Sequence, residues 1–141
     1  MKPHVEEAWR TLRLADRDIK AFDILKEAPE AHLSIVCFHA QQAVEKSLKA
    51  VLFSRHIEFE RSHDLVNLAR LLSSQDIVLP VTDDQLRRLN PFAVTFRYDD
   101  MDIELITRED AAGLAAAVRR WAEELVSAVT EREDTDGTDN D

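Results

Sequence analysis

The sequence predicts an all-α protein, an up-and-down bundle of four to five helices. Two observations carry this prediction. The 141-residue chain holds only two glycines, whereas a β-rich fold needs many turn residues. Apolar residues also recur in steps of three and four along several long segments, which is the spacing of helices with one buried face. The length suits one hydrophobic core, so we expect a single domain over residues 1–130 and no second domain.

The first two helices are expected to be long. Apolar residues in helical register cover residues 5–25, and this series places Trp9 in the core. The helix should end near Ala28, because Pro29 disfavours helical geometry in the residue before it. The second helix is expected at roughly residues 31–55.

The next two helices are expected to be shorter. Ser62 is the expected cap of a third helix, with a carboxylate two residues later in the positive first turn. Thr82 and Gln85 have the spacing of a capping box, which starts a fourth helix. Pro91 lacks a backbone donor and is expected to divide this helix near Asn90.

The last helix has the clearest apolar period. Residues 98–106 predict an irregular acidic loop before it, and Thr107 is the expected cap. Trp121 lies on the apolar stripe and is expected in the core. Residues 131–141 are mostly acidic and polar, which predicts a disordered, solubilising tail.

Composition and charge exclude several classes of function. The net charge of −10 disfavours tight, sequence-independent binding of nucleic acid to a broad basic surface. Cys37 is the single cysteine, so no intramolecular disulfide forms, and a reducing, cytoplasmic setting is expected. We expect neither a signal peptide nor a membrane span. The histidine and acid spacings predict no metal site, and no phosphate-binding glycine loop predicts a cofactor.

The second helix has two different faces. One face is apolar and is expected to lie in the core: Leu33, Val36, Cys37, Ala40, Val44, Ser47, Leu48 and Val51. The opposite face carries Gln42, Glu45, Lys46 and Lys49, and Ile35, Phe38 and Phe53 bracket it. A polar stripe between large apolar residues predicts a helix that packs on its own domain on one side and on a partner on the other.

Three segments together carry a resemblance to a known family. They are the run from Ala40 to Ala50 (AQQAVEKSLKA), Ser62-His63-Asp64-Leu65, and Phe96-Arg97-Tyr98. Over residues 5–130 the chain resembles the prokaryotic HEPN domain family. The resemblance implies a four- or five-helix bundle that dimerises and is often encoded beside a minimal nucleotidyltransferase. It also implies a role in a toxin–antitoxin or defence module, and nucleotide binding in some members.

The ribonuclease motif of that family is incomplete here. Many members are metal-independent ribonucleases with an arginine, four to six intervening residues and a histidine. Arg97 matches the arginine, but no histidine follows it at that distance. Arg55-His56 and Arg61-Ser62-His63 have the wrong spacing. We therefore assign no catalytic residue and expect a protein that is not an enzyme.

The candidate ligand-binding residues are polar side chains from the three family-like segments: Gln42, Glu45, Lys46, Lys49, His63, Arg97 and Tyr98. Lysine, guanidinium and imidazole groups complement the phosphate of a nucleotide or RNA. A structural interpretation is simpler and is favoured over a binding site: Glu45 and Lys49 form an i,i+4 ion pair while His63 and Asp64 stabilise a helix start.

Three functions follow from these alternatives. The first is a non-catalytic, homodimeric protein that binds nucleotide or RNA and works with a nucleotidyltransferase. The second is a ribonuclease toxin with a degenerate motif, in which Arg97 and His63 come from different segments. The third is a structural assembly subunit that binds neither ligand.

Overall fold

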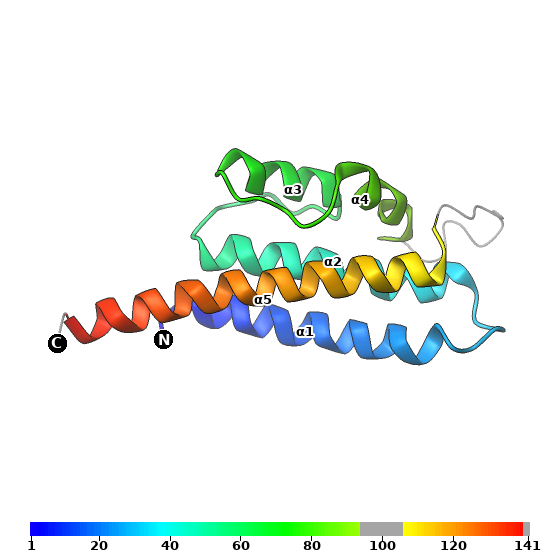
Figure 1. Ribbon diagram of the computed structural model, residues 1–141, viewed down its shortest axis with the longest axis horizontal. Coiled ribbons are helices and arrows are strands. Elements are labelled where there is room, and N and C mark those ends of the chain that lie inside the picture. The colour runs from blue at the N-terminus through cyan, green and yellow to red at the C-terminus, as the bar shows by residue number, and fades with distance from the viewer. Residues whose placement is uncertain (94–105, 140–141) are drawn as a thin grey trace.

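The computed structural model describes residues 1–93 and 106–139, with side chains as far as residue 135. Its elements are α1 (Pro3–Leu25), α2 (Leu33–Ser54), α3 (Leu65–Ser74), α4 (Asp83–Leu89), the 3-10 helix η1 (Asn90–Ala93) and α5 (Arg108–Asp139). The described residues contain no strand, so the predicted all-α class is confirmed. Long helices α1, α2 and α5 lie side by side, and α3 and α4 form a second layer over α2 (Figure 1).

Helix α2 is the centre of the core. It packs against α1, α5, α3, α4 and η1. Its predicted apolar face is buried, except that Leu33 is only partly covered. Small side chains at Ala40, Ala43 and Ala50, all fully buried, let neighbouring helices approach closely. No helix in the described part of the chain is both long and apolar enough to cross a membrane.

The predicted helix starts are mostly confirmed. Thr82 and Gln85 form the capping box, with the Gln85 backbone amide donating to Thr82 Oγ1 over 3.2 Å. Helix α4 ends before Asn90 and continues as η1, which is the predicted division at Pro91. Thr107 Oγ1 accepts a hydrogen bond from the amide of the third residue of α5 over 3.0 Å. Local sequence rules therefore place these boundaries correctly.

The predicted cap of α3 is wrong. Asp64, not Ser62, is the N-cap, and its Oδ1 accepts hydrogen bonds from the amides of Val66 (2.9 Å) and Asn67 (3.3 Å). Ser62 Oγ instead accepts from the Asp64 amide over 3.1 Å. Ser62 thus supports the turn that leads into the cap.

The structure also differs from the prediction for the acidic tail, because residues 131–139 continue α5 as a helix. Contacts with the start of α1 hold the first part of this extension. Trp9 Nε1 donates to Thr130 Oγ1 over 3.0 Å, and His4 Nε2 lies 2.7 Å from Glu133 Oε1. These tertiary contacts offset the weak helix propensity of an acidic segment.

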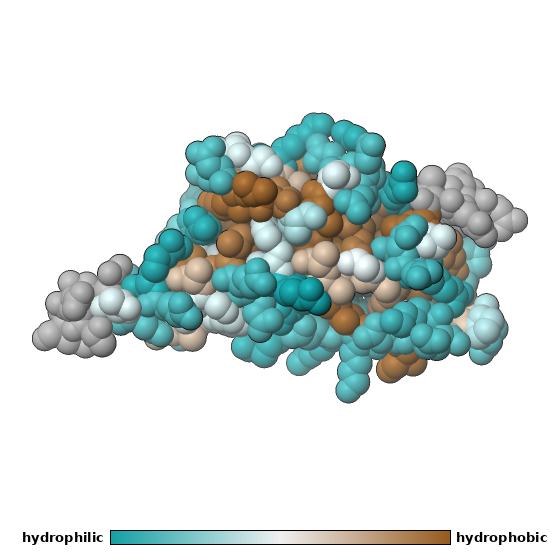
Figure 2. Space-filling view, in the orientation of Figure 1, coloured by the Kyte–Doolittle hydropathy of each residue, from teal (hydrophilic) through white to brown (hydrophobic). Residues whose placement is uncertain are grey.

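Both tryptophans lie at the edge of the core rather than within it. Trp121 Nε1 donates to the carbonyl oxygen of Val78 over 2.9 Å and so joins α5 to the connector before α4. Apolar surface gathers between α3 and α5 on the face seen in Figure 2. An indole at this border buries its ring and still satisfies its N–H group.

Candidate functional site

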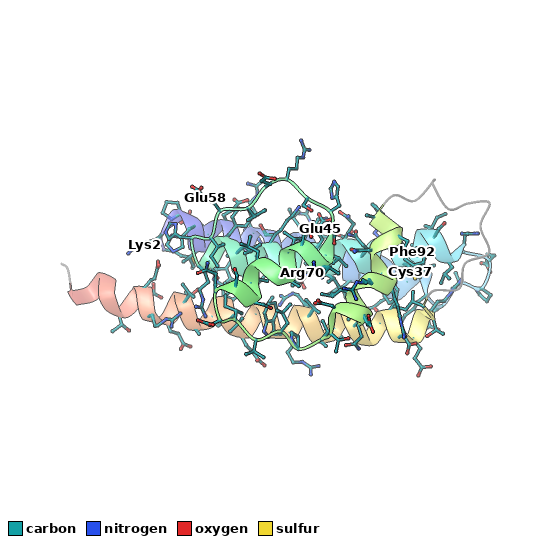
Figure 3. All side chains as sticks on the ribbon, turned by 90° about the horizontal axis from the view of Figure 1, so that it is seen from above. Lys2, Cys37, Glu45, Glu58, Arg70 and Phe92 are labelled. Atoms are coloured by element: carbon teal, nitrogen blue, oxygen red, sulfur yellow. The ribbon has the colours of Figure 1, made fainter. Side chains whose placement is uncertain are left out.

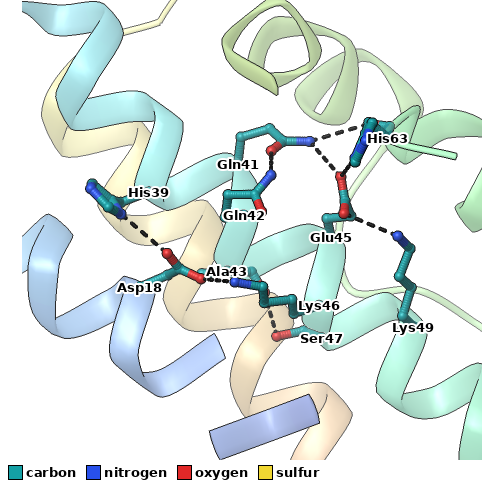
Figure 4. A network of polar contacts seen from close by, with 10 residues as sticks. All are labelled: Asp18, His39, Gln41, Gln42, Ala43, Glu45, Lys46, Ser47, Lys49 and His63. Carbon is teal, nitrogen blue, oxygen red and sulfur yellow. Dashed lines mark hydrogen bonds and ion pairs between the residues drawn. The ribbon is translucent and has the colours of Figure 1, made fainter. Parts of the chain in front are cut away.

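A buried carboxylate is the centre of the candidate site. The side chain of Glu45 is only 4% exposed. Lys49 Nζ donates to its Oε2 over 3.0 Å, and His63 Nδ1 lies 2.9 Å from its Oε1. Gln41 Nε2 also donates to Oε1, over 3.2 Å. We call these four residues the Glu45 cluster, and Figure 4 shows their contacts.

The helical repeat of α2 explains one half of the Glu45 cluster. Gln41, Glu45 and Lys49 are each four residues apart and therefore lie on one face of the helix. The predicted ion pair between Glu45 and Lys49 is confirmed. Seen from above, Glu45 lies beside the segment that leads into α3 (Figure 3). His63 belongs to that segment and completes the cluster.

The start of α3 fixes the position of His63. The carbonyl oxygen of His63 accepts from Gln41 Nε2 over 3.2 Å, and its neighbour Asp64 is the helix cap. Asn90 braces the same turn, because its Nδ2 donates to Asp64 Oδ1 over 3.0 Å and its Oδ1 accepts from the Leu65 amide over 2.8 Å. Three separate elements thus hold the backbone at His63.

The arrangement leaves one ring nitrogen of His63 available for chemistry. Nδ1 faces the Glu45 carboxylate, while the side chain as a whole is 61% exposed. A carboxylate on one imidazole nitrogen fixes the tautomer and the orientation of the ring. Nε2 can then donate a hydrogen bond to an anion or exchange a proton with a ligand.

Lys46 does not join the Glu45 cluster. Its ammonium group instead donates to Asp18 Oδ2 on α1, and His39 Nδ1 lies 3.1 Å from Asp18 Oδ1. We call Asp18, His39 and Lys46 the Asp18 cluster. Gln42 lies between the two clusters and donates from Nε2 to Gln41 Oε1 over 2.7 Å. The predicted grouping of Lys46 with Lys49 and His63 is therefore only partly correct.

The polar stripe of α2 also differs from its predicted role as an outward face. Glu45 is buried within its own chain. Of the apolar residues that bracket the stripe, Ile35 is 45% exposed, whereas Phe53 packs edge-on against Phe59 with ring centroids 5.3 Å apart. The sequence predicted that a partner would cover this face of α2. Residues of the segment before α3, such as Phe59 and His63, cover part of it instead.

Several site residues have no clear signal in the sequence. Asp18, His39, Gln41 and Asn90 become recognisable only when α1, α2 and η1 are brought together. The predicted residues Arg97 and Tyr98 lie outside the described residues. Among the residues that the structure does describe, no three histidine, cysteine, aspartate or glutamate side chains are arranged to hold a metal ion.

The fold and the site define an all-α bundle protein with a histidine–lysine site built on a buried carboxylate. The HEPN domain model matches residues 8–129, and the chain belongs to the HEPN domain family. The chain is also similar to the crystal structure of an archaeal HEPN homologue, at 22% identity and a TM-score of 0.57, over 89% of this chain and 99% of that chain. This likeness shows the fold alone. No curated protein matches the chain.

Proposed function

We propose that this HEPN protein binds the phosphate group of a nucleotide or RNA at the Glu45 cluster without cleaving it. We further propose that it is a cytoplasmic homodimer and acts with a minimal nucleotidyltransferase in a toxin–antitoxin or defence-type module. The observation that carries the binding proposal is the shared carboxylate. Glu45 contacts both Lys49 and His63, which brings two phosphate-compatible donors to one place.

The donors of the Glu45 cluster favour an anion near His63. The positive charge of Lys49 balances the Glu45 carboxylate, and the His63 imidazole adds a hydrogen-bonding group without a negative charge. The carboxylate is buried, whereas His63 reaches the surface, so an approaching phosphate meets donors first. The whole chain has a net charge of −10, so the rest of the surface repels a polyanion. Binding of RNA therefore depends on a confined site of this kind.

The binding test uses uridine monophosphate and a fluorescent hexauridylate, with His63→Ala and Lys49→Ala as site variants. Each substitution should weaken binding roughly tenfold, because each removes a charge-assisted hydrogen bond to phosphate. Lys26→Ala is the control, since Lys26 also forms an ion pair, with Asp23 on α1, and belongs to neither polar cluster of α2. If both site variants bind as well as the native protein, the Glu45 cluster is not the ligand site.

The partner proposal has its own test. The first step is to inspect the neighbouring genes for a minimal nucleotidyltransferase; the protein is then co-expressed with the tagged product of that gene, and the complex is isolated and its stoichiometry measured. Recovery of a complex containing two copies of this chain supports the proposed homodimer and partnership. Recovery of the nucleotidyltransferase alone would reject the proposed partnership and favour a structural subunit or a stand-alone protein.

A ribonuclease remains the second candidate function, and one observation favours it. Glu45 contacts His63 at Nδ1, and no hydrogen bond to Nε2 is present among the described residues, so this nitrogen can exchange a proton as in a general acid–base histidine. The test is incubation of native protein and His63→Ala with RNA in excess chelator. Cleavage that disappears in the variant supports the enzyme, whereas an intact substrate with the native protein rejects it.

A further inference from the structure

The second polar cluster on α2 repeats the chemistry of the first. Asp18 contacts Lys46 and His39, just as Glu45 contacts Lys49 and His63. In each case a largely buried carboxylate holds one lysine and one histidine. The Asp18 side chain is 12% exposed, whereas Lys46 and His39 are 28% and 26% exposed. In both clusters the acceptor therefore lies deeper than the donors.

The two clusters lie next to each other along α2. Lys46 and Lys49 are three residues apart, so their Cβ atoms are separated by about 5–6 Å on adjacent turns. Gln42 lies between the two clusters, and its Nε2 donates a hydrogen bond to Gln41 Oε1 (Figure 4). Each ammonium group has three donors and uses one on its carboxylate. Both lysines therefore retain donors for neighbouring phosphates.

An aromatic ring adjoins the second cluster. Phe38 is half-buried, and its ring meets the imidazole of His39 edge-on with centroids 5.3 Å apart. Proteins that bind single-stranded nucleic acid combine phosphate contacts with aromatic rings on which bases stack. Phe38, which contacts His39, therefore adds an aromatic ring to the phosphate-compatible donors of the Asp18 cluster.

We infer that the Asp18 cluster is a second phosphate subsite, which makes the ligand a single-stranded RNA segment rather than a mononucleotide. This inference rests on the proposed function, because the first phosphate is held at the Glu45 cluster. Lys46 and His39 contact the neighbouring phosphate, and Phe38 contacts a base. Asp18 positions both donors and is not itself a contact to RNA.

The test compares hexauridylate with uridine monophosphate in native protein, Lys46→Gln and His39→Gln. Glutamine keeps a donor toward Asp18, so the buried carboxylate retains a partner in the Lys46 variant. Lys46→Gln should weaken hexauridylate binding about fivefold to tenfold and leave uridine monophosphate unchanged. The slope of log K against log salt should also become shallower by about 0.7, as expected for one lost phosphate contact on a single strand. His39→Gln should act in the same direction.

Lys26→Gln is the control, because Lys26 is 31% exposed, close to the 28% of Lys46, and also forms an ion pair with an aspartate. Thermal unfolding checks that all variants are folded. The inference is overturned if hexauridylate and uridine monophosphate bind equally well, or if Lys46→Gln changes the oligomeric state and not RNA affinity. If the native protein binds neither ligand, the proposed function fails as well. Binding of the mononucleotide alone rejects only the second subsite.

Discussion

The buried carboxylate of Glu45 is stable in the core because every contact it needs is present. Oε1 has Gln41 and His63 as partners, and Oε2 has Lys49. Without such contacts, the cost of removing a carboxylate from water would exceed any gain from packing. The i,i+4 rule predicted the lysine contact, whereas the histidine contact joins residues 18 positions apart. Local spacing could not predict that second contact.

Removing Glu45 should destabilise the protein strongly. Glu45→Ala leaves Lys49 and His63 without their carboxylate partner and opens a cavity, so the free energy of unfolding should fall by about 3 kcal/mol in urea denaturation. The control is Asp84→Ala, because Asp84 pairs with Arg87 at the surface, where both side chains are more than half exposed. That variant should unfold almost as the native protein does. Equal losses in the two variants would contradict the structural role of Glu45.

Cys37 gives a prediction about pH. Burial raises the pKa of its thiol from 9.0 to about 11, although the nearby charge of Arg108 lowers it in part. The folded state therefore favours the protonated thiol, whereas the unfolded chain loses the proton at lower pH. The contribution of Cys37 to stability is complete below pH 9 and should decline as the pH rises toward 11.

The measurement for Cys37 is the free energy of unfolding at pH 7 and pH 10 for native protein and Cys37→Ala. Alanine leaves a small cavity and lowers stability at both values, so the informative quantity is the pH-dependent difference between the proteins. The native protein should lose more stability than the variant between pH 7 and pH 10. Identical losses would show that the buried thiol does not titrate as described.

At the scale of helices, the sequence predicted two of the three helix caps correctly and missed the cap of α3. The capping box at Thr82 and the division at Pro91 are encoded within a few residues, and both are confirmed. Two plausible caps, Ser62 and Asp64, compete at the start of α3. Asn90, which comes from η1, donates to Asp64 and so favours the aspartate. A distant residue thus decides between two choices that look similar in the sequence.

The two candidate caps of α3 should respond differently to mutation. Asp64→Ala removes the acceptor for two backbone amides and for Asn90, and should cost about 1–2 kcal/mol in the free energy of unfolding. Ser62→Ala should cost much less, because Ser62 accepts only from the Asp64 amide among the contacts described. Urea denaturation of both variants makes the comparison. A larger loss for Ser62→Ala would restore the cap predicted from the sequence.

At the scale of the whole molecule, Arg108 explains how α5 is fixed to the end of α1. An arginine at the first position of a helix opposes the helix dipole, so local rules disfavour it. Its guanidinium group compensates by donating to backbone carbonyl oxygens at the end of α1 and just after it: Leu25 (3.2 Å), Lys26 (3.0 Å), Ala28 (2.8 Å) and Ala31. These contacts join segments about 80 residues apart, so local sequence rules could not predict them.

Arg108→Lys should therefore be destabilising although it keeps the charge. A lysine ammonium group has three donors at one point and cannot span carbonyl groups that a planar guanidinium reaches from two nitrogens. Some of these half-buried carbonyls would lose their partners, at a cost of about 2 kcal/mol in the free energy of unfolding. Arg120→Lys, at an exposed position on the same helix, is the matched control and should change little. Equal stability of the two variants would mean that the charge of Arg108, and not the shape of its guanidinium group, joins α5 to α1.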